Sequence, residues 1–318
     1  MEACAGERVD ADVTPAPAES PLRMVRPELY PERPLSMRSR SETRRTVLGN
    51  GWRLSKVIQA LDARPYLVKK VRWGGLLLRA SESPHRVRLL SLGATGRTGR
   101  LVVQYALSSG HDVVALARNP RRIAASSPNL SIVTGTPENA EDIESALTGC
   151  DAVISTLGNS RSSDLPWAKL VSPPMFMTRS ISDTINAMRA RGIRRIVVVS
   201  ALGAGDSFPH APFITRLLAR RTNLRWSYAD HEAQEEVLRK SELDWTCVRP
   251  AILTDGTSLK PLVVSYEGRP KPALTITRAL VARFLVDILD KPEFFRKMPV
   301  VSEHSSLAAA IWSYAAAR

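Results

Sequence analysis

The sequence predicts a doubly wound α/β domain, in which helices cover both faces of a mostly parallel sheet. Three observations support this prediction. Short apolar runs alternate with segments of helical periodicity, at the intervals typical of strand–helix–strand units. A glycine-rich turn at residues 93–99 joins the first clear strand to the first clear helix. The stretch 195–200 is a continuous β-branched run, as expected of a strand that is buried on both sides.

The glycine-rich turn is the most informative segment of the chain. Val87–Leu92 predicts a strand, glycines follow at 93, 96 and 99, and apolar residues at helical spacing lead to Gly110. A second apolar run, Val113–Ala117, completes a strand–turn–helix–strand unit. The first glycine permits a sharp turn, the second lets a pyrophosphate approach the backbone, and the third allows the helix to pack closely. The unit predicts a Rossmann-like dinucleotide site, with an ordinary glycine-rich turn as the alternative.

The end of the second strand indicates which dinucleotide binds. Sites for NAD place an acidic residue here, which accepts hydrogen bonds from the ribose hydroxyls. This chain instead has Arg118-Asn119-Pro120-Arg121-Arg122. Guanidinium groups suit a 2′-phosphate. NADP(H) is therefore the expected cofactor, and a solvated basic turn is the alternative.

The remaining elements follow the same alternation. The expected later strands are 131–134, 151–156, 195–200, 244–250 and 298–301. The expected later helices are 137–147, with Pro137 at its first position, 172–191, 230–241, 276–289 and 305–317. Together these segments predict a sheet that continues well beyond the first strand–helix–strand unit.

The chain before residue 86 shows no such regularity. Residues 1–46 are rich in Pro, Glu, Ser and Arg, and they are expected to be a disordered extension. Residues 47–85 form an extension of uncertain role, with a short helix expected at Trp52–Leu61. Residues 86–318 are predicted to form the NAD(P)-binding domain, with the substrate region in its C-terminal part.

Composition argues against several function classes. The 318 residues carry a formal net charge of +14, but the basic residues are scattered and accompany no nucleic-acid motif. No apolar stretch is long enough to span a membrane. Cys4, Cys150 and Cys247 lie far apart, which predicts no metal site and favours a reducing compartment. We expect a cytoplasmic protein, monomeric or weakly self-associating, that binds a small-molecule substrate and neither nucleic acid nor membrane. Organellar targeting by the N-terminal extension remains open.

The residues that follow the expected strands are the candidate ligand contacts, because open α/β sheets bind ligands beyond the carboxyl ends of their strands. Ser200, at the end of the fifth strand, is the candidate catalytic residue that orients the nicotinamide or the substrate. A simple strand-end cap is the alternative role for this serine. The cofactor-binding candidates are Gly93, Thr95, Gly96, Arg97, Thr98, Gly99, Arg118, Arg122, Thr136, Thr156, Leu157 and Gly158.

These residues also resemble a known family. The turn Gly93-Ala94-Thr95-Gly96-Arg97-Thr98-Gly99, with Ala117-Arg118-Asn119, is similar to the atypical short-chain dehydrogenases, or NAD(P)H-binding NmrA-like proteins. The nearest group is that of biliverdin reductase B and flavin reductase. Val199-Ser200-Ala201 and the segments 243–250 and 266–269 also resemble this family. The resemblance implies that Ser200 faces the nicotinamide and that Arg122 lies near the 2′-phosphate.

The sequence departs from that family at three places. Thr136 stands where the family often has an aspartate, and Ala251-Ile252 follows Pro250 where the flavin-reductase group carries a histidine. Tyr228-Ala-Asp-His-Glu232 contains no lysine, so the Tyr/Lys proton relay of typical short-chain dehydrogenases is absent. Tyr66 and Lys70 have the spacing of that relay, but they precede the first strand and we reject them.

These features favour an NADPH-dependent oxidoreductase that transfers hydride to a flavin, a quinone or a conjugated carbonyl, since such acceptors need little acid catalysis. His210 and His231 could be donors from the substrate region, but surface histidines of no special role are the more common explanation. A non-catalytic protein that senses NADP(H), in a regulatory or assembly role, is the main alternative. An epimerase on the same fold is the third.

Overall fold

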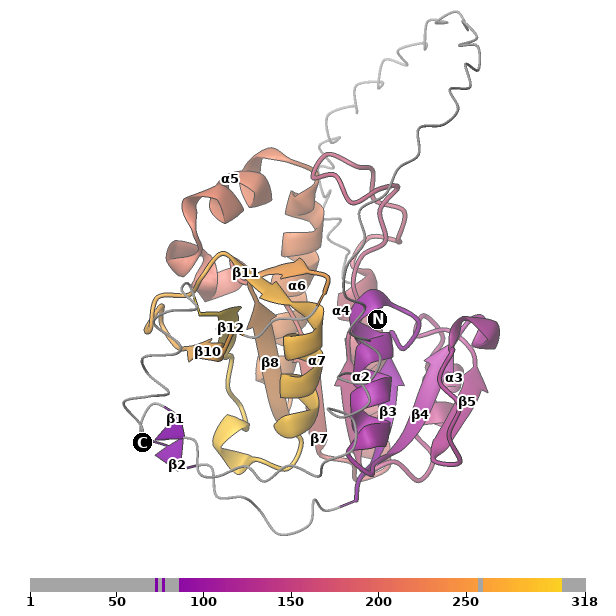
Figure 1. Ribbon diagram of the computed structural model, residues 1–318. Coiled ribbons are helices and arrows are strands. Elements are labelled where there is room, and N and C mark those ends of the chain that lie inside the picture. The colour runs from indigo at the N-terminus through magenta and orange to yellow at the C-terminus, as the bar shows by residue number, and fades with distance from the viewer. Residues whose placement is uncertain (1–71, 74–75, 78–85, 257–259, 305–318) are drawn as a thin grey trace, which may run out of the picture. The chain divides into compact units, whose positions relative to one another are not determined.

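The computed structural model of the chain describes residues 72–73, 76–77, 86–256 and 260–304 (Figure 1). All the described residues belong to one compact unit of the chain. Three expectations lie outside the described residues: the disordered extension 1–46, the helix 52–61 and the terminal helix 305–317. The domain boundaries at 46 and 85 remain predictions.

An eight-stranded sheet forms the centre of the domain. Seven strands are parallel, and only β10 at one edge is antiparallel to its neighbour. This arrangement confirms the predicted doubly wound α/β fold. The strands follow the order β10 (Leu262–Ser265), β12 (Val300–Glu303), β8 (Asp244–Pro250), β7 (Arg195–Val199), β6 (Ala152–Ser155), β3 (Arg88–Leu92), β4 (Asp112–Ala117) and β5 (Leu130–Thr134).

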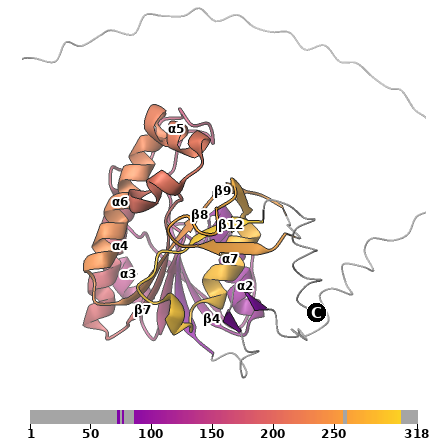
Figure 2. The same ribbon diagram turned by 90° about the vertical axis from the view of Figure 1, so that its left-hand side faces the viewer.

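Helices cover both faces of the sheet (Figure 2). One face is covered by α2 (Arg97–Ser108) and α7 (Arg278–Asp287), and the other by α3 (Ala140–Ala146), α4 (Phe176–Ala190) and α6 (Leu224–Lys240). Each face has its own apolar core, because successive side chains of a strand point to opposite sides. Val197 and Val199 of β7 join the core under α2 and α7, whereas Ile196 and Val198 join the core under α4 and α6.

Several short elements were not expected from the sequence. The structure adds α5 (Phe213–Arg221), a parallel pair of β9 (Ile252–Thr254) with β11 (Thr275–Thr277), and the edge strand β10. Three short 3-10 turns are η1 (Pro120–Arg122), η2 (Gly205–His210) and η3 (Pro292–Phe294). The antiparallel pair β1 (Arg72–Trp73) and β2 (Leu76–Leu77) precedes the domain in the sequence. Strands of three or four residues are too short to show a periodicity in the sequence.

Three expected helix boundaries were wrong. Pro137 does not start α3, because Asn139 caps it by accepting from the backbone N–H groups of Glu141 and Asp142. The prolines at 173 and 174 precede α4, which begins at Phe176. Helix α6 begins at Leu224, six residues before the expected start at Asp230. In each case a cap or a tertiary contact sets the boundary, and local propensity does not show it.

Candidate functional site

The strand order reverses between β3 and β6, and this is where a doubly wound sheet binds its ligand. From β3 the chain proceeds outward through β4 and β5, and it then returns to β6 on the other side of β3. The glycine-rich turn follows β3, and Thr156-Leu157-Gly158 follows β6. The structure therefore brings these two groups of predicted cofactor residues together at one edge.

The glycine-rich turn packs too tightly for larger residues. Gly93 has φ of +82°, which side chains rarely adopt. A Cβ on Gly99 would lie 2.0 Å from the carbonyl oxygen of Gly93 and 2.8 Å from Oγ1 of Thr156. The Thr156 hydroxyl also donates to the carbonyl of Leu92 at 3.1 Å. Thr156 thus fixes the turn from the neighbouring strand, and this close approach brings the start of α2 against the end of β3.

The N-terminus of α2 supplies the donors that a pyrophosphate needs. Gly96 is its N-cap, and no side chain caps the helix. The first helical hydrogen bond runs from the N–H of Arg100 to the carbonyl of Gly96, so the three preceding N–H groups have no helical acceptor. These belong to Arg97, Thr98 and Gly99. They lie at the positive end of the helix dipole, which suits an anion.

Arg118 and Arg122, the residues predicted to contact a 2′-phosphate, lie just after β4. Arg118 directly follows β4, and Arg122 ends the η1 turn that Asn119 stabilises by accepting from the N–H of Arg121. Both arginines are exposed, and neither forms an ion pair with any described acid. Two guanidinium groups are therefore available at this corner of the sheet.

Arg97 is in a different situation from the other two predicted arginines. Its guanidinium forms ion pairs with Asp164 at 2.9 Å and with Asp255 at 3.5 Å. Asp255 also binds Arg278 at 2.8 Å. A contact between the Arg97 side chain and a phosphate would have to replace these exposed pairs. Its backbone N–H remains the more direct contribution to a cofactor site.

Thr136 also has its polar groups engaged. Its backbone N–H donates to the carboxylate of Asp142 at 2.8 Å, and its hydroxyl accepts from the N–H of Glu138 at 3.3 Å. Gly135 is essential to this arrangement, because a Cβ there would lie 2.6 Å from the Asp142 carboxyl carbon. The carboxylate of Asp142, on α3, therefore lies beside Thr136 at the end of β5. From the sequence, only Thr136 was predicted to lie at this position.

Leu157 and Gly158 have different environments. Leu157 is buried in the apolar core and helps to anchor the segment after β6. Gly158 is exposed, with nothing within 4 Å of a Cβ built on it, so the backbone here borders open space. Thr95 is half-buried within the glycine-rich turn.

A buried aspartate organises the next part of this edge. Asp230 of α6 accepts from the backbone N–H groups of Met177 at 3.1 Å and Thr178 at 3.0 Å, and from the Thr178 hydroxyl at 2.7 Å. These are first-turn donors of α4, so Asp230 caps a helix other than its own. It also accepts from the Asn159 side chain at 3.1 Å, which fixes the loop after β6.

Ser200 belongs to a buried charge network. Its side chain is buried, and its hydroxyl donates to Glu235 at 2.7 Å. The guanidinium of Arg249 also binds Glu235, at 2.8 and 2.6 Å, and forms a short contact with Asp206. Burial lowers the pKa of Arg249, but hydrogen bonds to Glu235 outweigh burial and raise it above its usual range. The proton of Ser200 is thus committed to Glu235, and its oxygen can still accept a hydrogen bond.

Tyr228 and His231 are the other titratable groups of this part of α6. Burial raises the pKa of Tyr228 to about 12, so its phenol stays neutral. Burial also lowers the pKa of His231, and its buried Nδ1 has no hydrogen-bond partner among the described residues. His210 is exposed in the η2 turn. At neutral pH, Tyr228 and His231 are both uncharged, so each can donate a hydrogen bond but is a poor acid.

Asp142, Asp230 and Glu235 organise this part of the structure, but none of them was predicted as a site residue. Asp230 and Glu235, on α6, lie 53 and 35 positions from Met177 and Ser200, whereas Asp142, on α3, lies only six positions from Thr136. The one available sign was the spacing on α6, where Asp230 and Gln234 are one turn apart and occupy positions that face the core. A polar residue on an inward-facing stripe indicates a buried network, but it does not identify the partner.

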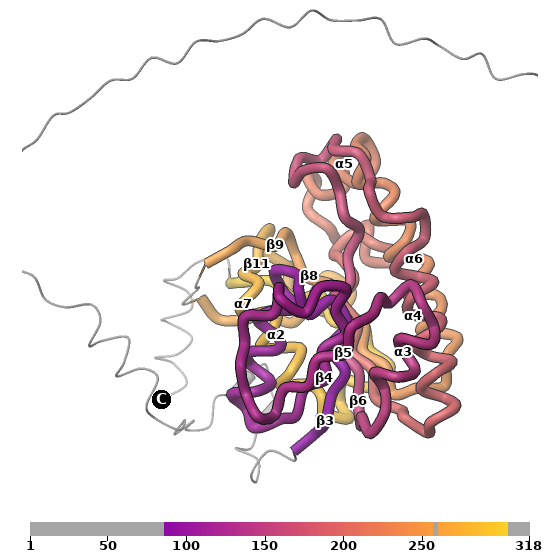
Figure 3. The backbone as a smooth tube through the Cα atoms, turned by 90° about the vertical axis from the view of Figure 1, so that its right-hand side faces the viewer, coloured from indigo at the N-terminus to yellow at the C-terminus, as the bar shows by residue number. Residues whose placement is uncertain are grey.

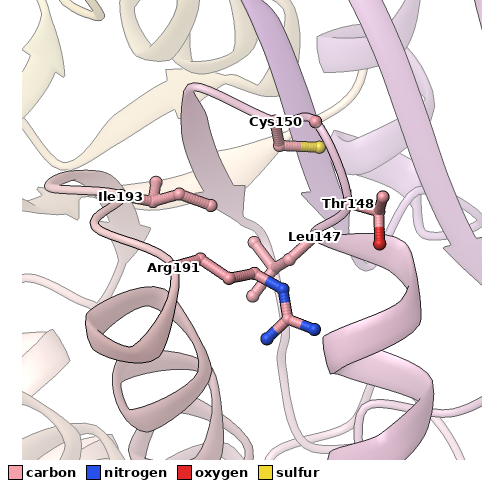
Figure 4. Close-up of a pocket in the computed structure, with 6 residues that line it drawn as sticks. Leu147, Thr148, Cys150, Arg191 and Ile193 are labelled. Carbon is pink, nitrogen blue, oxygen red and sulfur yellow. The ribbon is translucent and has the colours of Figure 1, made fainter.

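Figure 4 shows a shallow cavity whose lining includes none of the predicted site residues. It has a volume of about 360 Å³ and is lined by residues 147–150, Arg191 and Ile193. These residues precede β6 and β7, so the cavity is at the amino ends of the strands. Burial raises the pKa of Cys150, at its border, to about 11. This thiol is neutral and lies at the end of the strands opposite the predicted cofactor site, so it does not indicate a second active site.

Two expected absences can be examined only within the described residues. No group of His, Cys, Asp or Glu in this part of the chain has a geometry that could hold a metal ion. None of the helices described is long and apolar enough to cross a membrane.

Comparison with known proteins supports the family resemblance. The sequence model of the NAD(P)H-binding family matches residues 93–292. The photosystem II assembly factor Ycf39 of Synechocystis is 30% identical over 228 residues, which cover 69% of this chain. The match spans only 64% of Ycf39 itself.

Solved structures give the same fold. An anaerobilin reductase, ChuY from Escherichia coli, is 21% identical with a TM-score of 0.56, over 69% of this chain and 98% of ChuY. A short-chain dehydrogenase/reductase from Veillonella parvula, solved in complex with NADP, is 19% identical with a TM-score of 0.56. That alignment covers 70% of this chain and 96% of the bacterial protein. The matched family region contains both the glycine-rich turn and the β7–β8 edge, and the chain belongs to the NAD(P)H-binding family.

Proposed function

We propose that the protein is an NADPH-dependent oxidoreductase that transfers hydride to a flavin, a quinone or a conjugated carbonyl. The observation that carries this proposal is the edge formed by β3, β4 and β6. There, the free N–H groups of α2 adjoin a turn too tight for any residue but glycine at position 99. Arg118 and Arg122 stand unpaired, among the described residues, at the adjacent corner.

The choice of NADPH over NADH rests on that corner. The carboxylate that NADH sites use at the end of the second strand is absent, and Arg118 occupies its place. An exposed guanidinium without an acidic partner contributes its full charge to a 2′-phosphate. The domain's positive net charge favours the approach of the same anion.

The choice of acceptor rests on the proton donors near Ser200. Among the described residues near Ser200 there is no lysine four positions after a tyrosine, and the nearby Tyr228 is a weak acid. Flavins, quinones and conjugated carbonyls accept hydride with little acid catalysis and take their proton from water. In this scheme the oxygen of Ser200, oriented by Glu235, accepts a hydrogen bond from the nicotinamide carboxamide or the substrate.

A second function is an assembly or sensing role that uses bound NADP(H) without turnover. Two observations favour it. The relative Ycf39 is named as an assembly factor, and the hydroxyl of Ser200 is already hydrogen-bonded to a buried carboxylate. This function needs the same cofactor contacts and makes no demand on Ser200.

The experiment combines cofactor binding with a panel of acceptors. We expect NADPH to bind more tightly than NADH, and NADPH to be oxidised by at least one flavin, quinone or conjugated carbonyl. Arg118→Ala should weaken NADPH binding by about tenfold to hundredfold and spare NADH, because a charge-assisted contact contributes about 1.5–3 kcal/mol. Arg189→Ala, an exposed arginine on α4, is the matched control.

The outcomes separate the candidate functions. Equal losses for both cofactors would show that Arg118 does not read the 2′-phosphate. Tight NADPH binding without oxidation by any acceptor would favour the assembly or sensing role over the reductase.

A further inference from the structure

Helix α5 exposes the residues that helices normally bury. Phe213 is 71% exposed, and Ile214 and Leu217 are more than 40% exposed. The opposite side of the helix, which packs against the domain, carries the small residues Thr215 and Ala219. Because a surface helix usually places its large apolar residues inward, this inversion indicates that the outer face has a partner.

Aromatic residues extend the apolar surface beyond α5. Trp226, at the start of α6, is 53% exposed, and Trp167, in the loop after β6, is 65% exposed. The loop is tied to the α5–α6 junction, because the side chain of Asn223 donates to the carbonyl of Trp167 at 2.6 Å. Indole rings with an apolar body and a polar N–H suit the boundary between water and an apolar phase.

The charge of this segment has one sign. Residues 207–229 contain four arginines, at 216, 220, 221 and 225, and no aspartate or glutamate. None of the four forms an ion pair with a described acid. Arg220 lies over the ring of Phe208 at 4.3 Å, and Arg225 over the ring of Trp226 at 4.9 Å. The arginines therefore border the apolar residues and face no negative charge of the described chain.

The position of α5 leaves this face open to a broad surface. The helix projects beyond the carboxyl ends of the strands, on the side of the sheet covered by α6 (Figures 1 and 3). Its inner side contacts α6. A projecting convex helix suits a flat partner better than it suits a peptide, which would need a groove.

Contrary to the expectation from composition, we propose that this arginine–aromatic face, made of Phe213, Ile214, Leu217, Arg220, Arg221 and Trp226, docks on an anionic lipid bilayer. The apolar side chains enter the boundary between headgroups and acyl chains, and the arginines bind the headgroup phosphates. Charge and apolar surface together favour an anionic bilayer as the partner. A neutral bilayer would leave the positive charge of the arginines unbalanced, and a purely acidic protein surface would leave Phe213 and Leu217 in water. Docking would bring the carboxyl ends of the strands, where the proposed cofactor site lies, close to the membrane surface. Quinones and other apolar acceptors are concentrated there.

The test is flotation of the full chain with vesicles of phosphatidylcholine, with or without about one third phosphatidylglycerol. We expect binding to the anionic vesicles and much weaker binding to the neutral ones. Arg220→Gln with Arg221→Gln should weaken anionic binding by roughly 25-fold, because each arginine near such a surface contributes about a factor of five. Phe213→Ser with Leu217→Ser should weaken it by roughly tenfold.

Residues before 86 are themselves basic and add binding to anionic vesicles in every variant. The matched controls therefore change residues in other parts of the domain, so that only the position of the change differs. Arg189→Gln with Lys297→Gln removes two exposed charges at the amino ends of the strands, and Ile132→Ser removes an exposed apolar residue on β5. Both controls should bind like the unaltered chain. Circular dichroism of every variant checks that the fold is retained.

Tryptophan fluorescence reports insertion directly. Vesicles that carry brominated lipids should quench part of the emission, and Trp226→Phe should reduce the quenched fraction. Three results would overturn the proposal: no binding to anionic vesicles, equal losses in the control variants, or losses in the arginine variant alone. The last result would indicate an acidic macromolecule as the partner, since only lipid docking requires the apolar residues.

Discussion

Ser200 joins the ligand-binding edge of the sheet to a buried charge network, because its hydroxyl donates to Glu235 while its backbone follows β7. We expect Ser200→Ala to lower turnover by about tenfold to hundredfold on whichever acceptor the unaltered protein reduces. NADPH affinity should stay within a few-fold, since the phosphate contacts lie near α2 and β4. The measurement is kcat, together with the Kd for NADPH.

A stability measurement distinguishes catalysis from capping. The substitution also removes a hydrogen bond to a buried carboxylate, so the free energy of unfolding should fall by about 1.5–3 kcal/mol in either case. If kcat at a temperature well below Tm is unchanged while stability falls, Ser200 serves only the Glu235–Arg249 network. Reduced kcat in a folded variant supports its role toward the ligand.

At the residue scale, the sequence identified positions better than it identified interactions. Gly93, Gly96 and Gly99 were recognised because their spacing reflects a backbone requirement, and the 2.0 Å approach at Gly99 shows that requirement. The ion pairs of Arg97 and the partner of Ser200 could not be inferred. They depend on residues 35 to 158 positions away in the chain, whose proximity only the folded sheet creates.

At the element scale, Asp230 connects α6 to α4. We expect Asp230→Ala to destabilise the protein by about 2 kcal/mol, the upper end for loss of a helix cap, because the carboxylate is buried and binds first-turn donors of α4. Asp230→Asn keeps one oxygen acceptor and should cost less. Urea unfolding of the two variants is the measurement. Equal losses would mean that the charge alone, and not the cap geometry, stabilises α4.

The junction between α2 and β4 should respond to pH. Nδ1 of His111 accepts from the N–H of Val87 at 3.3 Å, and burial lowers the pKa of His111. Below its ordinary pKa, about 6.5, the unfolded chain binds the proton more readily than the folded one. Stability should therefore fall as pH decreases from 7 to 5.

Other groups act in the same direction, including Asp112, whose pKa is lowered by its hydrogen bond to Arg86, so a variant of His111 is needed to isolate its contribution. Burial lowers the pKa of His231, and the pKa of Asp206, which burial raises, is lowered overall by Arg249. The two aspartates contribute only at more acidic pH. His111→Gln keeps an acceptor for Val87 and cannot titrate, so its Tm should change less between pH 7 and 5. An unchanged pH profile would assign the effect to other groups.

For the molecule as a whole, the sequence predicted the fold class and most strands of the parallel sheet, because buried strands are continuous apolar runs and their turns carry glycines. It missed α5 and the small β9–β11 pair. Residues 213, 214, 217 and 218 of α5 are apolar and at helical spacing, so the periodicity was present in the sequence, but that pattern does not show that most of this face points outward. The same inversion is the basis for the proposed docking face.

The last prediction concerns how much of the chain the fold requires. Both apolar cores consist of residues between 87 and 301, and every strand of the main sheet lies between 88 and 303. We therefore expect a chain that begins at Ser81 to unfold cooperatively and to bind NADPH within a few-fold of the full-length protein. Thermal unfolding and NADPH titration of the two chains are the measurements. If the shortened chain is insoluble while the full chain is soluble, residues 47–80 contribute to the core and the predicted boundary is wrong.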